Sequence, residues 1–311
     1  MDESEFESTR PVVVLTALSL EYEAVRAHLK GPQRLVHDGT WFEAGKVSGA
    51  GCPVLLAEAG PGNRPAAFVT EQARIRFMPR AVFFVGVAGS LKADVRIGDV
   101  LVGTKIYAYD GAKHVDGAVL ARPDSWVAPH GLLQTALHAL KGEAWQQRIA
   151  GGRDRAGQQS PKVHFKPIAA GETVLSSLAS GLREMLFRNY NDAAAIEMES
   201  VGLAATGALG GMETLTVRGI SDHTDGYKAA ADAAGSQEKA AVHAAAAAIE
   251  TIAALDGTAP PSARPGGETA AGVSKAIQMN TASGGGVINA VQKGTLTITQ
   301  TPGHVPGPAE R

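Results

Sequence analysis

The sequence predicts an α/β fold with a mixed, mostly parallel central sheet flanked by helices. Short apolar runs rich in β-branched residues occupy 11–15, 54–57 and 81–85 and are typical of buried parallel strands. Stretches with helical spacing of apolar residues, at about 21–29 and 65–77, separate these runs. Strands that alternate with helices indicate βαβ units, and these units build a largely parallel sheet.

The second half of the chain continues this alternation. Further strands are predicted at 99–102, 164–170 and 213–220. A helix is predicted over 193–209, and the alanine-rich stretch 239–255 is expected to form a closing helix because alanine has the highest helix propensity.

Two glycine-rich segments, 60–63 and 86–89, are predicted as turns at the carboxyl ends of strands. Ligands of open α/β sheets bind outside that edge, and glycine allows the backbone to approach a ligand closely. An ordinary strand-to-helix turn explains each segment equally well.

Composition changes along the chain divide it into four parts. These are an N-terminal tail (1–10), an α/β domain (11–255), a Pro/Gly/Ser-rich linker (256–271) and a β-prone C-terminal tail (272–311). Forty residues cannot bury much core alone, so the tail is expected to be disordered or ordered through a partner, by strand pairing. Within the domain, the polar stretch 141–162 is interpreted as a surface insertion.

Composition and charge also exclude several classes of protein. The 311 residues are 44% hydrophobic with a formal net charge of −2, which argues against nucleic acid or an anionic membrane as the main partner. The single cysteine, Cys52, cannot form an internal disulfide, and paired-cysteine zinc patterns are absent from the sequence. We expect no metal, no cofactor and no membrane span, and a cytoplasmic location.

Four acidic residues lie where strand ends are predicted. Glu21 follows the first strand, Glu197 and Glu199 stand two apart beside Met198, and Asp222 follows the strand 213–220. An enzyme that breaks a covalent bond by acid–base catalysis needs a proton donor for the leaving group and a group that activates the nucleophile. Carboxyl groups suit both tasks, although each acid alone is equally consistent with a solvated side chain or a helix cap.

Four segments together resemble the superfamily of purine nucleoside phosphorylases and methylthioadenosine/S-adenosylhomocysteine nucleosidases. They are 17–25 (ALSLEYEAV), 86–91 with 97–100 (GVAGSL, IGDV), 195–200 (AIEMES) and 217–222 (VRGISD). Their order and spacing make the resemblance specific, and it covers about 11–255. It implies a nucleoside phosphorylase-like fold and an enzyme that cleaves purine N-ribosyl bonds.

The resemblance also implies roles for individual residues. Asp222 matches the acid that protonates purine N7 or hydrogen-bonds there, and Ser221 would orient it. Met198 and Glu199 match the pair at the ribose, and Glu197 is expected to add hydrogen bonds. The remaining assignments are Val87, Ala88 and Gly89 beside the sugar and Glu172 at the base. Arg218, on the strand that leads to Asp222, either forms an internal ion pair or has another role that the sequence does not specify.

Glu21 bears on the choice between two reactions. In the hydrolytic branch a glutamate at this position activates water, whereas the phosphorolytic branch places phosphate ligands there, which a carboxylate would repel. We therefore favour hydrolysis, an activity of the EC 3.2.2 type, with Glu23 as the fallback for Glu21. Phosphorolysis stays open because Arg64 could meet an anion.

The segment 107–113 and the pair Arg122-Pro123 depart from the housekeeping nucleosidases and are similar to nucleosidase effector domains of bacterial defence systems. Lys113 and Arg122 could contact substrate phosphates, or they could be ordinary surface charges. A nucleotide-sensing module with little basal turnover is the other alternative. The family implies a homo-oligomer, and the choice between adenine and guanine and the 5′ substituent of the ribose stay open.

Overall fold

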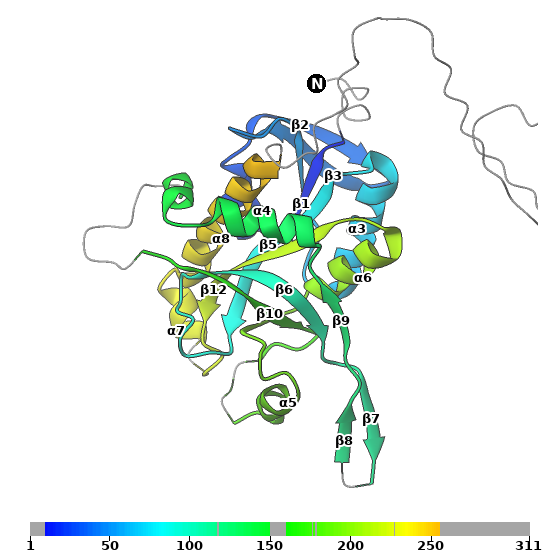
Figure 1. Ribbon diagram of the computed structural model, residues 1–311, viewed down its shortest axis with the longest axis vertical. Coiled ribbons are helices and arrows are strands. Elements are labelled where there is room, and N and C mark those ends of the chain that lie inside the picture. Colours follow the sequence, from blue (N-terminus) through cyan, green and yellow to red (C-terminus); the bar gives the residue numbers. More distant parts are fainter. Residues whose placement is uncertain are drawn as a thin grey trace, which may run out of the picture. The chain divides into compact units, whose positions relative to one another are not determined.

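The computed structural model describes residues 10–116, 118–149, 160–175, 177, 179–226 and 228–255. These residues form a mixed α/β fold with a central sheet between helices, as the sequence predicts (Figure 1). The predicted linker 256–271 and the β-prone tail 272–311 lie outside the described residues. None of the helices in the described ranges has the length and apolar character that a bilayer crossing requires.

Ten strands make up the main sheet. Its order is β11-β10-β6-β12-β5-β1-β4-β3-β2, with β9 paired to β6. The strands are β1 (Val12–Thr16), β2 (Lys30–His37), β3 (Thr40–Lys46), β4 (Val54–Glu58), β5 (Ala81–Ser90), β6 (Val100–Ala108), β9 (Asp124–Val127), β10 (Val163–Ala170), β11 (Ala195–Glu197) and β12 (Thr214–Asp222). A separate two-stranded hairpin, β7 (Ala112–Val115) and β8 (Ala118–Ala121), projects from this body (Figure 1).

Strand direction explains where a site can form. β4, β1, β5 and β12 are neighbours and run parallel, so their carboxyl ends meet at one edge. β6 is antiparallel to β12 and parallel to β10, and β11 pairs with β10 on one side and antiparallel with β5 on the other. The pairing of β11 with β5 therefore closes five strands into a ring beside that edge.

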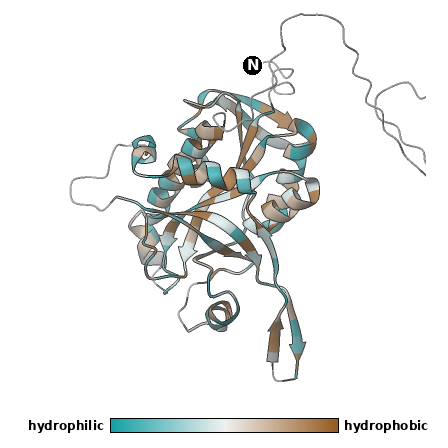
Figure 2. Ribbon diagram, viewed as in Figure 1, coloured by the Kyte–Doolittle hydropathy of each residue, from teal (hydrophilic) through white to brown (hydrophobic). Residues whose placement is uncertain are grey.

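Helices cover both faces of the sheet because strand residues alternate between them. Val12 and Val14 face α2 (Ser19–Arg26), α4 (His130–Ala139) and α8 (Ser236–Ala254), whereas Val13 and Leu15 face α3 (Asn63–Phe77) and α6 (Ser200–Gly210). Apolar residues run along the central strands between these helices (Figure 2). The remaining helical elements are α5 (Gly181–Asn189), α7 (Lys228–Ala233) and a 3₁₀ turn (Ala144–Arg148).

The alanine-rich helix α8 packs unusually close to the sheet. Ala244 to Ala248 are fully buried, and a side chain on Gly219 of β12 would overlap the backbone carbonyl of Ala240. Small side chains on both elements allow this approach, so the alanine tract is an interior feature of the domain.

Three sequence predictions are corrected by the structure. Segment 86–89, predicted as a turn, belongs to β5, because β12 pairs with Val87 and Ala88 and β11 pairs with Gly89. The predicted helix 193–209 is instead strand β11 followed by helix α6. Residues 221–222, expected after a strand, form the end of β12.

Candidate active site

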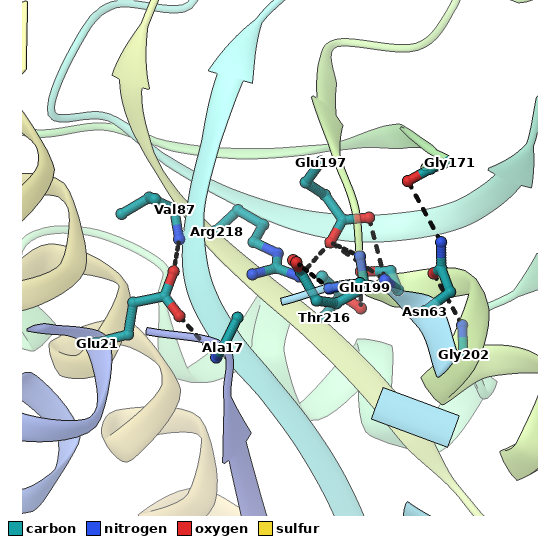
Figure 3. Close-up of polar contacts among 12 residues, drawn as sticks. Ala17, Glu21, Asn63, Val87, Gly171, Glu197, Glu199, Gly202, Thr216 and Arg218 are labelled. Carbon is teal, nitrogen blue, oxygen red and sulfur yellow. Dashed lines mark hydrogen bonds and ion pairs between the residues drawn. The ribbon is translucent and has the colours of Figure 1, made fainter. Parts of the chain in front are cut away.

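Glu21 lies on the first turn of α2, directly after β1, and is 2% exposed. Its Oε2 accepts hydrogen bonds from the backbone N–H groups of Ala17 (2.8 Å) and Leu18 (3.0 Å), and its Oε1 accepts one from Val87 (2.8 Å) (Figure 3). A carboxylate offers about four acceptor positions. The three backbone bonds fix the orientation of the group and leave one acceptor position on Oε1.

Burial raises the pKa of the Glu21 carboxyl above its ordinary value of 4.5, although Arg218 and the three backbone N–H groups oppose the shift. A carboxylate with a raised pKa binds a proton more readily than an exposed one. This property suits a general base that must take a proton near neutral pH.

Arg218 on β12 is fully buried and connects the acids. Its Nη2 donates to Glu197 and to Glu199 Oε2 (3.1 Å), and its guanidinium carbon lies 4.8 Å from the centre of the Phe84 ring. Its Nε and Nη1 have no hydrogen-bond partner within the described ranges. Figure 3 shows the guanidinium between Glu21 on one side and the two other glutamates on the other.

The side chains of Glu21 and Arg218 both pack directly against Gly86. A Cβ atom at position 86 would lie 2.5 Å from Glu21 Oε1 and would overlap Arg218 Nη1. Both groups therefore occupy the space that a side chain at 86 would need, and glycine leaves that space to them.

Glu197 and Glu199 are held by the start of α6. The Glu197 carboxylate accepts hydrogen bonds from the backbone N–H groups of Glu199 (3.1 Å) and Ser200 (3.1 Å), and so satisfies donors at the helix N-terminus. Glu199 Oε1 accepts a hydrogen bond from the backbone of Gly62 (3.1 Å), in the loop after β4. Burial and the neighbouring Glu197 raise the pKa of Glu199, and Arg218 opposes the shift.

Asp222 ends β12 and is 3% exposed. Its Oδ2 accepts a hydrogen bond from the Ser221 hydroxyl (3.0 Å), and its Oδ1 accepts one from the backbone N–H of Thr224 (2.9 Å). Each carboxylate oxygen is thus fixed by a donor close in sequence.

The acids open onto one cavity of about 170 Å³ at the carboxyl ends of the strands. Four carboxylates line it, from Glu21, Glu197, Glu199 and Asp222, and within the described ranges no lysine or arginine does. The apolar part of the cavity wall consists of Leu18, Val87, Val174, Leu175, Ile196 and Met198. The described residues contain no group of three or more His, Cys, Asp or Glu side chains that could hold a metal ion. The arrangement can therefore do acid–base chemistry beside an apolar wall that suits a planar base.

Comparison with known families identifies the chain. The family model described as the phosphorylase superfamily matches residues 11–254. The chain belongs to the phosphorylase superfamily. This membership accounts for the strand order and for the position of the cavity at the switch point of the sheet.

Two relatives within the superfamily carry named activities. The chain is 28% identical over 241 residues to "ATP nucleosidase Cap17" of Escherichia coli strain KTE188, a match that covers 71% of this chain and 47% of the relative. It therefore spans about half the length of that relative. It is 26% identical over 217 residues to the 5′-methylthioadenosine/S-adenosylhomocysteine nucleosidase of Chromohalobacter salexigens, which covers 68% of this chain and 84% of the relative.

Two solved structures share the fold of this chain. The 5′-methylthioadenosine/S-adenosylhomocysteine nucleosidase of Colwellia psychrerythraea, solved with adenine, superposes with a TM-score of 0.67 at 20% identity and covers 79% of this chain and 96% of that one. The futalosine hydrolase of Helicobacter pylori superposes with a TM-score of 0.64, also at 20% identity, over 79% and 98% of the two chains.

Most residues predicted from the sequence lie together at the cavity. They are Glu21, Val87, Ala88, Gly89, Glu197, Met198, Glu199, Ser221 and Asp222. Glu23, the fallback for Glu21, is exposed on the outer side of α2, and Arg64, the expected anion contact, is exposed on the first turn of α3.

Three predicted contacts are not among the residues that line the cavity. Glu172 is exposed, where its side chain accepts from Asn63 Nδ2 (3.0 Å) and its N–H donates to Asp110 Oδ2 (3.0 Å). Lys113 is exposed on the β7–β8 hairpin, and Arg122 is exposed just after it (Figure 1).

Several lining residues have no counterpart in the sequence predictions. Thr173, Val174 and Leu175 follow β10, and Leu18 follows β1. The rule that placed the acids, that side chains just beyond the carboxyl ends of parallel strands gather at one edge, would also have found Leu18. Thr173, Val174 and Leu175 follow a strand that runs opposite to β12, and they reach the cavity because β11 pairs with both β10 and β5. Thr224, two residues beyond β12, falls under the same rule.

Proposed function

We propose that this chain hydrolyses the N-glycosidic bond of a purine ribonucleoside or nucleotide and releases the free base. The observation that carries the proposal is the convergence of four carboxylates from separate segments on one cavity. Membership of the phosphorylase superfamily and relatives named as nucleosidases support the same chemistry.

In the proposed reaction Asp222 donates a proton, or a hydrogen bond from its protonated form, to purine N7. The bond between the base nitrogen and C1′ then breaks, and its electron pair leaves with the base. Glu199 and Met198 face the ribose, where a carboxylate stabilises the developing positive charge. Water attacks C1′, and Glu21 takes its proton through the remaining acceptor position on Oε1. The products are a free base and a sugar with a hydroxyl at C1′.

Water fits this cavity better than phosphate as the nucleophile. Glu21 stands on the nucleophile side, and no cationic side chain in the described ranges lines the cavity. The Arg218 guanidinium lies behind the carboxylates and is already paired with two of them. A phosphate dianion would therefore meet like charge without a cation to offset the repulsion.

The 5′ substituent defines the substrate within this class. The apolar wall suits a nucleoside or its thioether, while a nucleotide would need cations for its phosphates. Lys113 and Arg122 do not line the cavity of this chain and could supply these cations from a second copy. We therefore propose both nucleosides and nucleotides, ATP included, as candidates for a substrate screen.

We also propose that the chain forms a homo-oligomer. Large apolar side chains stay exposed on three helices, with Phe68 and Ile75 on α3, Phe187 on α5 and Leu209 on α6. A second copy would remove such surface from water. A protein partner bound by 272–311, in a defence system, is proposed on the sequence alone. Light scattering after size-exclusion chromatography measures the oligomeric state directly, and a monomer at micromolar concentration would overturn the oligomer.

A chromatographic assay for free base tests the proposed activity. Adenosine, methylthioadenosine, S-adenosylhomocysteine, AMP and ATP are incubated with the full chain, with the variant Glu21→Gln and with the control Glu23→Gln. Glu21→Gln is expected to lower kcat/KM about a hundredfold or more, the range for a lost general base. Glu23→Gln, on the same helix but exposed, should leave it unchanged. If activity is lost in Glu23→Gln and not in Glu21→Gln, the general base is Glu23. If no base is released from any substrate, the proposal is overturned.

A further inference from the structure

Thr224 lies two residues after Asp222, lines the same cavity and is 1% exposed. Its φ is +53°, in the left-handed region. This region is unfavourable for a β-branched residue, because Cβ crowds the neighbouring backbone. Such conformations persist only where the surroundings hold them, and they gather at functional sites. The contacts of Thr224 therefore indicate what holds it and why.

The Thr224 hydroxyl is fixed from two sides. It donates to the backbone carbonyl of Ser90 (3.1 Å) and accepts from Arg183 Nη1 (2.7 Å), and the same nitrogen lies 3.5 Å from the Thr224 carbonyl oxygen. A hydrogen bond from a charged donor is roughly twice as strong as a neutral one. Arg183 comes from α5, which the buried side chain of Leu186 anchors to the domain.

The left-handed conformation of Thr224 directs its backbone N–H toward Asp222, the proposed acid. In this conformation the Thr224 N–H points back to Asp222 Oδ1 (2.9 Å). Gly89 makes room for the arrangement, because a Cβ there would lie 2.5 Å from Thr224 Cγ2 and 3.0 Å from Asp222 Oδ1. Three segments of the chain thus cooperate to place a single N–H donor.

We infer that Arg183 and Thr224 are positioning residues that hold the Asp222 carboxylate in the orientation needed at the purine. The inference rests on the proposed function for the role of Asp222. The contacts from Arg183 to Thr224 and from Thr224 to Asp222, here called the clamp, do not depend on turnover. Its consequence is that α5, which supplies no side chain to the cavity lining, is part of the machinery that orients the acid. Small errors in the placement of a reacting group lower the rate of the chemical step.

Two substitutions at 224 separate the clamp from mere packing. Thr224→Val keeps the shape and the branched Cβ but removes the hydroxyl, so the backbone is free to leave the left-handed region. Thr224→Gly also lacks the hydroxyl but adopts positive φ without strain. Arg183→Met removes the charged donor. Arg188→Met is the matched control, because Arg188 lies on the same helix, is exposed and pairs with Glu184 at the surface (2.6 Å).

The kinetic experiment compares these variants in base release. Thr224→Val and Arg183→Met should each lower kcat about tenfold or more with KM within about twofold, because orientation and not binding is lost. Thr224→Gly should lower kcat less than Thr224→Val does, and Arg183→Met should lose little further in the Thr224→Gly background, which is the signature of coupled residues. Equal losses in Thr224→Gly and Thr224→Val, or an unchanged effect of Arg183→Met in both backgrounds, would overturn the inference.

Crystal structures of the 224 variants test the clamp without reference to activity. Thr224→Val should show negative φ at 224 and an N–H turned away from Asp222, whereas Thr224→Gly should keep positive φ and the hydrogen bond. If wild-type protein releases no base, the proposed function fails while these structures still decide on the clamp. A valine at 224 that retains the left-handed conformation would contradict it.

Discussion

Gly86→Ala probes the point at which Glu21 and Arg218 meet. The added Cβ would lie 2.5 Å from Glu21 Oε1 and would overlap Arg218 Nη1, and both side chains are buried and held by other bonds. Overpacking of a core typically costs about 1–3 kcal/mol. Displacement of either side chain would break a hydrogen bond to a charged group, which adds about 1.5–3 kcal/mol.

A loss of about 3 kcal/mol should lower Tm by about 6–12 °C in a domain of this size. Differential scanning calorimetry measures that shift. In the base-release assay, the fractional loss of kcat/KM should be larger than the fractional loss of unfolding free energy. Gly131→Ala is the matched control, since a Cβ on the first turn of α4 meets nothing within 4 Å. It should be neutral or stabilising by about 0.4–1 kcal/mol. Wild-type Tm and activity in Gly86→Ala would refute the proximity of the two groups.

Three further predictions follow from the buried charges and the packing of α8. Arg218→Met leaves two buried carboxylates without their cation and should lower stability by about 3–5 kcal/mol, measured as a fall in Tm; an unchanged Tm would contradict the pairing. Because burial raises the pKa of Glu21 and the base must be ionised, kcat/KM should fall as pH decreases through a value above 4.5; a pH–rate profile that is flat down to pH 4.5 would exclude this assignment. Gly219→Ala should abolish soluble expression or lower Tm more than Gly86→Ala, because its Cβ would meet the rigid backbone of Ala240; normal expression with wild-type Tm would show that α8 can move away.

The fold was predictable wherever local pattern and tertiary environment agree. β1 and β4 are continuous apolar runs because both of their faces are buried, which is the property that the sequence displays. The alanine stretch in 239–255 predicts a helix from propensity alone, although only the structure explains why it is alanine: β12 approaches the helix backbone at Gly219.

The sequence analysis missed or mispredicted the elements that form because of tertiary pairing. β11 is three residues long and forms because β10 and β5 pair with it. No local sequence pattern predicts such a strand. Segment 86–89 is extended for the same reason. The β2–β3 hairpin did carry a local signal, Asp38-Gly39 with both φ values positive, a turn sequence typical of tight hairpins.

The residues of the site also differ in whether the sequence alone could predict them. Glu21, Glu199 and Asp222 could be predicted because each is an acid just beyond, or at, the end of a strand. The position of Thr224 follows from the same rule, but its left-handed conformation and its contact with Arg183 could not be predicted, because they depend on the local backbone and on the packing of α5. The prediction that Lys113 and Arg122 contact substrate phosphates rested on a resemblance and on charge, and neither determines which surface a side chain occupies.

Base release in phosphate-free buffer, with wild-type protein and Asp222→Asn side by side, tests the central claim most directly. Wild-type protein should release free base at a rate that added phosphate does not raise, and Asp222→Asn should be slower by about a hundredfold or more. Release that depends on phosphate and yields a sugar 1-phosphate, or full activity in Asp222→Asn, would contradict hydrolysis by converging carboxylates.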